Sequence, residues 1–391
     1  MKILKTPYYS FKLGKLAKGC QLCVKGEKLV VYITGVCNRN CFYCPLSEEK
    51  KNKDVLFANE WNTEIKNGKL TEAQYKILIK EAKLCNAKGA GITGGDPLLV
   101  CKRTCDVIKR LKKEFGKKFH VHLYTSLNNI TEERLNDLYK AGLDEIRVHP
   151  EFESKRFWHR VDLITKYGWD FGMEIPAIPG FEKITKEMID YFANKIDFLN
   201  LNELEISDTN ACHLLNKGFK PKNKLSYGVK GSQELALKLM KYIAQKKYKF
   251  DVHFCTCKLK DSVQLAQRIK KRAGNVAYKF DKITNQGILV RGVIYLENLF
   301  PGFSYRKKLK AISVEEKKQI LKTLDKIKKE LIKKFKLHES DIIVDDYKLR
   351  LLTSNAFVKN NSIKIKQMKL LPAVVQEYPT HDGIEIEVAP L

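Results

Sequence analysis

The chain has 391 residues, 44% of them hydrophobic, and its 73 Lys and Arg against 45 Asp and Glu give a formal net charge of +28. No run approaches the roughly 18 consecutive apolar residues of a membrane helix, and the N-terminal segment lacks the apolar core of a secretory signal. These features argue against a membrane protein and predict a cytoplasmic one, where eleven cysteines are poorly suited to a disulfide framework. The excess positive charge favours a polyanionic partner, nucleic acid first.

From residue 29 onward, short apolar runs alternate with helical patterns. We expect strands over 29–35, 90–94, 120–126, 144–149, 170–178, 198–206 and 250–256. We expect helices over 71–89, 101–116, 131–142, 153–168, 185–196 and 232–247, the third starting at Thr131 and stopping at Gly142. This alternation is typical of right-handed βαβ units and predicts an α/β fold, a partial barrel of six or seven units. The reactive residues of such barrels lie at the carboxyl ends of the strands.

Beyond residue 256 the alternation stops. Basic helices are expected over 258–275 and 314–335, among strand-like runs at 287–296, 362–368 and 384–388. Residues 257–391 hold 28 Lys and Arg against 15 Asp and Glu. We therefore expect three parts: an N-terminal extension over 1–28 with a C-x2-C pair, the barrel over 29–256, and a basic α+β domain over 257–391.

Three cysteines directly follow the first expected strand. Cys37, Cys41 and Cys44 form a C-x3-C-x2-C pattern. A structural zinc site usually takes four ligands, often as two separated C-x2-C pairs. Three thiolates in one short loop instead suit a 4Fe–4S cluster, with one thiolate on each of three irons. The fourth iron then has no protein ligand and is free to bind a substrate or cofactor.

The triplet resembles the signature of the radical S-adenosylmethionine (radical SAM) superfamily, including the aromatic Tyr43 before the last cysteine. The stretch GITGGDPL at 91–98 resembles the GGEP motif of the family, with Asp96 in place of Glu. The resemblance covers roughly residues 29–256, and it is nearest to archaeal radical SAM proteins related to pyruvate formate-lyase-activating enzyme.

That resemblance implies an oxidoreductase with a 4Fe–4S cluster on Cys37, Cys41 and Cys44, and SAM as cofactor. It also implies a one-electron reductant of the ferredoxin or flavodoxin kind. Reduction would cleave SAM to methionine and a 5′-deoxyadenosyl radical. Glycines let the backbone approach a ligand closely, and proline stiffens the turn. The residues expected at the SAM site are Tyr43, Gly94, Gly95, Asp96, Pro97, Ser126 and Arg147. Arg147 is expected to end the fourth strand and to meet the SAM carboxylate.

Two further cysteine pairs lie far apart in the sequence. Cys20 and Cys23 form C-x2-C before the first strand, and Cys255 and Cys257 form C-x-C at the end of the last barrel strand. Together they have the ligand count of a second site, for zinc or an auxiliary iron–sulfur cluster, although either pair can equally be inert thiols. The remaining cysteines are expected to be structural: Cys85, Cys101, Cys105 and Cys212.

The substrate class is left open by the motifs. The positive charge favours an RNA, such as tRNA, modified by the radical enzyme, with phosphate contacts at Arg268, Lys270, Lys271 and Arg272. The alternative is a protein or peptide substrate, as for the pyruvate formate-lyase-activating relatives. A third hypothesis, a barrel that has become a non-catalytic binding module, is disfavoured by the intact cysteine triplet. The sequence fixes neither the reaction outcome nor the oligomeric state.

Overall fold

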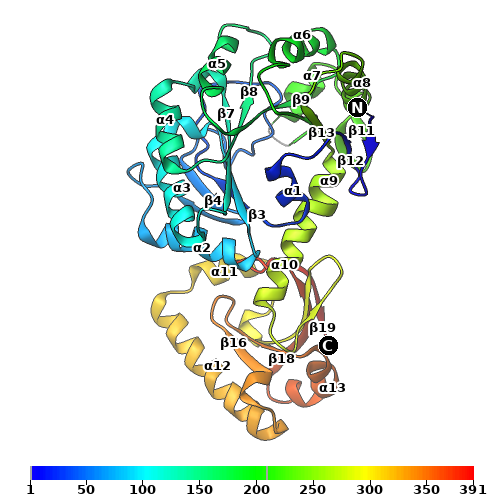
Figure 1. The fold of residues 1–391 in the computed structure, drawn as a ribbon. Coiled ribbons are helices and arrows are strands. Elements are labelled where there is room, and N and C mark those ends of the chain that lie inside the picture. Colours follow the sequence, from blue (N-terminus) through cyan, green and yellow to red (C-terminus); the bar gives the residue numbers. More distant parts are fainter. Residues whose placement is uncertain (1, 208–209) are drawn as a thin grey trace. The chain divides into compact units, whose positions relative to one another are not determined.

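The computed structural model describes residues 2–207 and 210–391, apart from the side chains of Ala211 and Cys212. It contains two compact units, Met1–Arg268 and Ile269–Leu391 (Figure 1). The division lies beyond the expected boundary at residue 256. The reason is that Leu259 and Val263, after that boundary, pack with Val24 and Cys255 in a small apolar cluster of the first unit.

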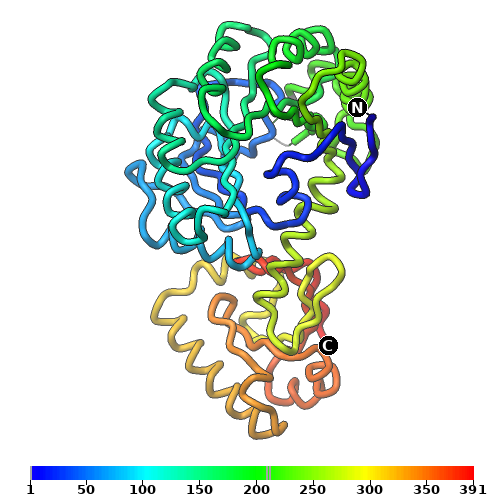
Figure 2. Tube along the Cα trace, in the orientation of Figure 1, coloured from blue at the N-terminus to red at the C-terminus, as the bar shows by residue number. Residues whose placement is uncertain are grey.

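The first unit is built on an open, curved sheet. Its parallel strands are β3 (Lys28–Tyr32), β6 (Gly89–Thr93), β7 (His120–Ser126), β8 (Glu145–His149), β9 (Asp170–Ala177), β10 (Phe198–Glu203) and β13 (Asp251–Cys255). The antiparallel strands β4 (Val55–Ala58) and β5 (Trp61–Glu64) extend the sheet from β3. At the other edge, β2 (Phe11–Leu13) pairs with β13 and β1 (Leu4–Lys5) with β2, as Figure 2 lets the eye follow. Within the described residues no ladder joins β1 to β5, so the expected partial β/α barrel is confirmed.

Helices follow most of these strands and cover the outer face of the sheet (Figure 1). The longer ones are α2 (Glu72–Leu84), α3 (Cys101–Phe115), α4 (Glu132–Ala141), α6 (Glu182–Phe192) and α8 (Ser232–Gln245). The shorter ones are α5 (Val161–Ile164), α7 (Ala211–Asn216) and α9 (Cys257–Leu259), which continues through a π-helical turn (Lys260–Leu265) into α10 (Ala266–Val276). A small hairpin of β11 (Pro221–Asn223) and β12 (Ser226–Val229) precedes α8. No helix of the described chain has the length and apolar character that crossing a bilayer requires.

Local sequence signals correctly predicted the ends of one helix but wrongly predicted a second helix. As predicted, the Thr131 side chain caps α4 by accepting from the amide of Arg134, and Gly142 ends it in the left-handed conformation. The helix predicted over 153–168 is wrong, since only a 3₁₀ turn (Trp158–Arg160) and α5 form there. The Trp158 indole donates to the Glu151 carbonyl, and Arg160 donates to the Asn128 carbonyl. These contacts hold an irregular loop where the apolar spacing suggested a helix.

A short helix that the sequence analysis did not predict, α1 (Lys18–Val24), fills the amino-terminal end of the barrel interior. It contacts β3, β6 and β7. The amide of Gly19 donates to the carboxylate of Glu145, the first residue of β8, at 3.0 Å. A Cβ added at Gly19 would lie 2.7 Å from the Arg147 guanidinium and 2.8 Å from the His122 ring, so only glycine allows this approach.

A buried arginine fastens α3 to the start of the sheet. The Arg103 guanidinium binds both carboxylate oxygens of Asp54 at 2.7 Å and donates to the carbonyls of Ile33 and Gly68. The Thr34 hydroxyl also donates to Asp54 at 2.8 Å. Asp54 therefore joins α3 to the segment that follows β3 and leads toward the cysteine triplet.

This contact predicts an acid dependence of stability. The Arg103 hydrogen bonds lower the pKa of Asp54 below its ordinary value of 3.8. A lowered folded-state pKa stabilises the fold above the ordinary value, and this stabilisation is lost as pH falls through the folded-state pKa. We expect Asp54→Asn to destabilise the protein at pH 7, with a deficit that shrinks below pH 3.8. Urea unfolding at several pH values measures this; an equal deficit at every pH would contradict it.

The second unit is an antiparallel α+β domain, as expected. Its sheet runs β16 (Ile342–Asp345), β17 (Arg350–Thr353), β15 (Leu289–Leu296), β18 (Leu370–Glu377) and β19 (Glu385–Pro390), with β14 (Lys282–Ile283) also on β15. One face is covered by α12 (Val314–Phe335) and α13 (Asn355–Lys366); α11 (Tyr305–Ala311) contributes Tyr305 to the cluster on the other face. The strand-like run at 362–368 lies largely in α13, so that prediction is wrong. Its alternation misled because only Ile365 is buried, whereas Ile363 is 73% exposed.

Candidate functional site

A cavity of about 630 Å³ lies at the carboxyl ends of the parallel strands in the first unit. Its walls include the residues that end these strands, among them Thr93, Ser126, His149 and Glu203. This is the end of the barrel at which the sequence placed the chemistry. The cavity is lined by all but one of the residues expected at the cluster and SAM sites: Cys37, Cys41, Tyr43, Cys44, Gly94, Gly95, Asp96, Ser126 and Arg147. The exception is Pro97, which is buried and does not line the cavity.

The cysteine loop, residues 37–44, is held by its own backbone and by Arg39. The amide of Cys44 donates to the Cys41 carbonyl at 3.1 Å, and the Arg39 amide donates to the Cys37 sulfur at 3.4 Å. The Arg39 guanidinium donates to the His149 carbonyl at 2.9 Å and lies 3.4 Å from the Glu151 carboxylate. Arg39 thus fixes the loop to the end of β8, a role that the sequence analysis missed.

The three thiols fit a metal cluster by their chemistry. All are free and half-buried, and all line one cavity. Burial raises the pKa of the Cys37 and Cys41 thiols, with Arg39 acting in the opposite direction on both. Thiolates at this position therefore need a compensating cation, which an iron–sulfur cluster provides.

Gly94 and Gly95 bring the second strand end against the cysteine loop. The Gly95 amide donates to the Thr34 carbonyl at 2.8 Å, and the Asp96 amide donates to the Val36 carbonyl at 2.9 Å. A Cβ at Gly94 would lie 2.4 Å from the Thr34 carbonyl oxygen, and one at Gly95 would lie 2.3 Å from that of Val36. The glycines are required by contact with the protein's own backbone, whereas the sequence analysis explained them by contact with a ligand alone.

Gly95→Ala is therefore expected to displace residues 34–36 and, with them, the cysteine loop. Backbone atoms cannot move aside as a flexible side chain can, so we expect cluster content after reconstitution to fall severalfold. Gly168→Ala is the matched control, because nothing lies within 4 Å of its Cβ position. Iron and sulfide content per chain measures the effect, and equal content in both variants would contradict it.

Asp96 is the centre of a buried network. Its carboxylate accepts five hydrogen bonds, two of them from side chains at the end of β7: the Thr125 hydroxyl at 2.7 Å and the Ser126 hydroxyl at 2.6 Å. The Asn129 amide donates to it at 2.7 Å and also pairs with the Asn38 amide in the cysteine loop. Asp96 is 1% exposed. Its side chain therefore positions the residues around the site.

Tyr43 and His149 link the cysteine loop to β9. The Tyr43 hydroxyl lies 2.8 Å from His149 Nε2, and His149 Nδ1 lies 2.9 Å from the Glu174 carbonyl oxygen. Burial, reinforced by Arg39, lowers the pKa of His149 to about 3, so the ring is neutral. A carbonyl only accepts, so Nδ1 carries the proton and Nε2 accepts from Tyr43. Tyr43 thus has a structural partner for its hydroxyl, and its carbonyl accepts from the Asn210 side-chain amide at 3.2 Å.

Arg147 does not lie where the sequence placed it. It is the third residue of β8, not the last, and its guanidinium is 2% exposed. Glu145 binds it at 2.5 Å and Glu174 at 2.7 Å. Inward-facing positions of a barrel strand point into the core, so Arg147 forms the cavity floor. With both glutamates in place, it has no surplus charge for a SAM carboxylate, and the structure does not support that expected contact.

The additional cysteines behave mainly as packed thiols. Cys20 is buried, with its sulfur 3.4 Å from Arg147, and Cys255 is buried in the apolar cluster of Val24. Among the described residues, no three sulfurs of Cys20, Cys23, Cys255 and Cys257 lie within 4.8 Å of one another. One tetrahedral zinc ion would hold its sulfurs about 3.8 Å apart, so a zinc site is not preformed. A multi-iron cluster spaces its thiolates more widely, so an auxiliary cluster stays a prediction.

The other cysteines and the basic segment are placed as follows. Cys85 and Cys105 are buried and Cys101 is half-buried, whereas the Cys212 side chain lies outside the described residues. Arg268 is paired with Glu60 at 2.5 Å. Arg272 is 4% exposed and donates to the Pro379 carbonyl, so the structure does not support phosphate contacts for these two arginines. Lys270 is exposed and Lys271 half-buried.

The comparisons agree with this geometry. Residues 31–192 match the model of the Radical SAM superfamily. A protein of Methanocaldococcus jannaschii described as a putative glycyl-radical enzyme activating enzyme is 38% identical over 98% of this chain and 95% of its own length. The chain therefore belongs to the radical SAM superfamily, whose members use a 4Fe–4S cluster and SAM. Within it, this protein is a radical SAM enzyme related to the enzymes that activate pyruvate formate-lyase.

Other similarities are partial. A probable GTP 3′,8-cyclase of the same organism is 29% identical over 36% of this chain and 41% of its own. The solved structure of methylornithine synthase aligns with a TM-score of 0.38 at 16% identity, over 57% of this chain and 63% of its own.

Proposed function

We propose that this radical SAM enzyme acts on a polypeptide, from which its radical abstracts a hydrogen atom. The observation that carries the radical chemistry is the set of three free thiols, Cys37, Cys41 and Cys44, on one wall of the cavity. A 4Fe–4S cluster held there supplies, once reduced, the cleavage of SAM to methionine and a 5′-deoxyadenosyl radical. The polypeptide substrate is supported by the near full-length similarity to the described glycyl-radical enzyme activating enzyme.

The chain's own residues would bind and orient the ligands. Gly94, Gly95 and Asp96 line the cavity beside the cysteine loop, where backbone groups of this turn that are not bound to residues 34–36 would meet SAM. Glu174, Asn202, Glu205 and Lys260 line further parts of the same cavity. At about 630 Å³ it is within the range of small-molecule sites, roughly 300–1,000 Å³, which suits SAM and one inserted residue of a chain.

Isotope transfer tests the proposal. The reconstituted protein is given SAM, a reductant and an extract of its source organism grown on glycine deuterated at Cα. We expect deuterium to appear in 5′-deoxyadenosine, because hydrogen abstracted from glycine ends there. Protease treatment of the extract should remove the transfer and nuclease treatment should not. SAM cleavage without deuterium transfer would refute a glycyl target. Transfer that is removed by nuclease but not by protease would favour RNA.

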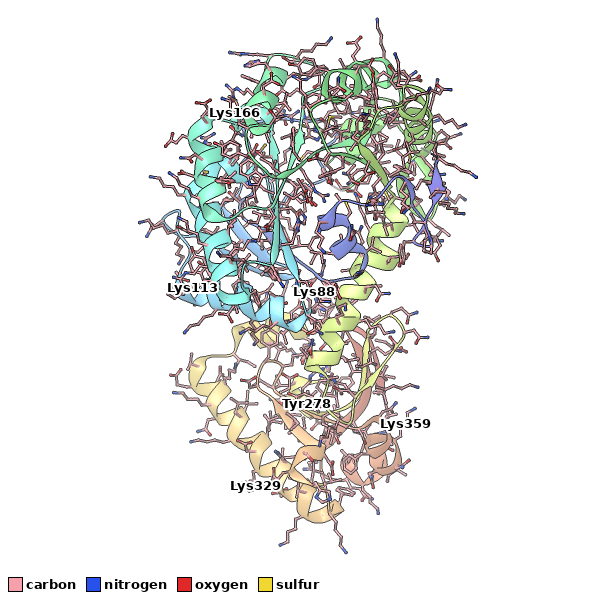
Figure 3. All side chains as sticks on the ribbon, viewed as in Figure 1. Lys88, Lys113, Lys166, Tyr278, Lys329 and Lys359 are labelled. Atoms are coloured by element: carbon pink, nitrogen blue, oxygen red, sulfur yellow. The ribbon has the colours of Figure 1, made fainter. Side chains whose placement is uncertain are left out.

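RNA is the second candidate, and one observation favours it. Six exposed lysines form a stripe on α12 and its C-terminal cap: Lys318, Lys322, Lys326, Lys329, Lys333 and Lys336. At 3.6 residues per turn they fall within an arc of about 80° and extend over about 27 Å. Figure 3 labels Lys329 on this helix. Of the acidic side chains of α12, Glu315 lies within this arc one turn before Lys318, and Asp325 lies about 20° outside it. Such an array suits the repeated charges of a phosphate backbone.

Charge reversal tests this candidate. Lys322→Glu, Lys329→Glu and Lys333→Glu together should weaken tRNA binding at least tenfold and flatten its salt dependence. The matched control reverses three exposed lysines of α3: Lys102, Lys109 and Lys113. Equal loss in both triple variants would show a general charge effect, and no tRNA binding by the parent protein would remove the candidate.

A further inference from the structure

A second cluster of metal-ligating side chains lies at the amino-terminal ends of the barrel strands. His120 is the first residue of β7, Glu145 the first of β8 and Asp170 the first of β9. These strands are neighbours in the sheet. One ligand atom from each residue lies within 4.8 Å of the others. The cluster lies at the amino-terminal ends of these strands, and none of its three residues lines the cavity.

The strand register explains the convergence. Glu145 pairs with Asp170 in the β8–β9 ladder, and Glu145 pairs with His122 in the β7–β8 ladder. His120 is two residues before His122, so both histidines face the same side of the sheet as Glu145. The three side chains therefore meet without any special loop conformation.

The burial of the histidine is not explained by a hydrogen bond to the described part of the chain. His120 is 8% exposed, and neither ring nitrogen makes a hydrogen bond to a described residue. Its Nε2 lies 3.5 Å from the nearer Glu145 oxygen, which is too far for a good hydrogen bond. Buried polar nitrogens normally have a hydrogen-bond partner, so the ring of His120 is an exception that needs an explanation. Its nitrogens lie next to the two carboxylates and keep a lone pair and a proton that no described residue uses.

The two carboxylates have free acceptor positions, and their mutual repulsion favours binding of a cation. Glu145 gives one oxygen to Arg147. Among the described residues, its other oxygen accepts a hydrogen bond from the Gly19 amide alone, so a lone pair remains. Asp170 is exposed, which gives an entry path from solvent. Burial raises the pKa of Asp170, and so do the nearby carboxylates of Glu145 and Asp197. Burial also lowers the pKa of His120, which favours the neutral ring that metals bind.

We propose that His120, Glu145 and Asp170 bind a divalent transition metal ion, with zinc as the preferred ion. The protein would supply one nitrogen and two carboxylate ligands, and water would complete the coordination shell. Such donors suit zinc and its neighbours better than calcium or magnesium, which prefer oxygen alone. The metal would join three adjacent strands at the end where α1 is anchored through Glu145. At this end of a β/α barrel, bound groups serve stability rather than the reaction.

Cobalt binding to the reconstituted holoprotein tests the site, because the cluster then occupies Cys37, Cys41 and Cys44. We expect one equivalent of Co²⁺ to bind and to raise the thermal unfolding temperature. The difference spectrum between the protein with and without Co²⁺ should show only weak visible bands, since no thiolate binds the ion. An intense thiolate-to-cobalt band would place the ion on the remaining cysteines and overturn the proposal.

Two variants and two controls complete the test. His120→Ala and Asp170→Asn should each weaken Co²⁺ binding at least tenfold, as loss of a ligand requires. Asp170 is exposed, so its variant is expected to fold even if the histidine variant does not. The controls are His159→Ala, an exposed histidine, and Asp197→Asn, the neighbouring carboxylate. No Co²⁺ binding, or equal binding by Asp170→Asn and its control, would refute the site.

Discussion

Replacing any one of Cys37, Cys41 and Cys44 by alanine is expected to abolish SAM cleavage by the reconstituted protein. We expect 5′-deoxyadenosine formation to fall by more than about 100-fold, since even residues that only support a metal site typically contribute about 10–100-fold. The physical reason is that the variant has two cysteine ligands in place of three. A second iron of the cluster would then lack a protein ligand and would be lost more easily. The measurement is 5′-deoxyadenosine released per chain with a strong reductant, together with iron content.

Cys101→Ser is the control for this series, because Cys101 is half-buried on α3 and does not line the cavity. It should keep both the cluster and SAM cleavage. Wild-type activity in a triplet variant would show that the cysteine loop does not hold the cluster.

Asp96→Asn is expected to have the second largest effect, on stability as well as on the site. The amide keeps the shape of the carboxylate but turns one acceptor oxygen into a donor, which then faces donors already present. The Asp96 carboxylate accepts five hydrogen bonds at 1% exposure. Hydrogen bonds to a buried charge contribute about 1.5–3 kcal/mol each, so we expect a loss of about 3–5 kcal/mol in the free energy of unfolding.

Urea unfolding of the cluster-free protein measures this loss, with Asp106→Asn as the control, since Asp106 is an exposed acid on α3. We also expect weaker SAM binding by the reconstituted Asp96→Asn protein, because Ser126 and the Asn38–Asn129 pair lose their common anchor. A loss below about 1 kcal/mol would mean that water replaces the missing contacts, and that Asp96 is not the centre of the site.

Strand positions were predictable from the sequence because the inner strands are short runs that carry apolar residues at least at every second position, as Val121 and Leu123 do in β7. The β4–β5 hairpin was missed although a signal exists. Asn59 adopts φ +52° in the two-residue turn between the strands, and asparagine there is a known hairpin preference. The side-chain contacts of Asp96 were not predictable, because Thr125, Ser126 and Asn129 lie about 30 positions away in the sequence and only the fold brings them to the carboxylate.

The same limit applies to Arg39, His149 and Glu174. Nothing in the local sequence says that Arg39 reaches the His149 carbonyl, 110 positions away. His149 ends a parallel strand, so the rule that strand ends carry the chemistry could have named it. For Arg147 the rule was applied to a residue two positions short of the strand end, and the alternation of inward and outward side chains then placed it in the core.

The pairing of β2 with β13 has a consequence for synthesis on the ribosome. Leu13 pairs with Val252, 239 positions later, so the first edge of the barrel has no partner until almost the whole unit has been made. At about 5–20 residues per second, the nascent N-terminal segment waits roughly 10–50 s. Phe11, Leu13 and the apolar side of α1 are exposed to other proteins during this time, which makes the nascent chain a client for chaperones.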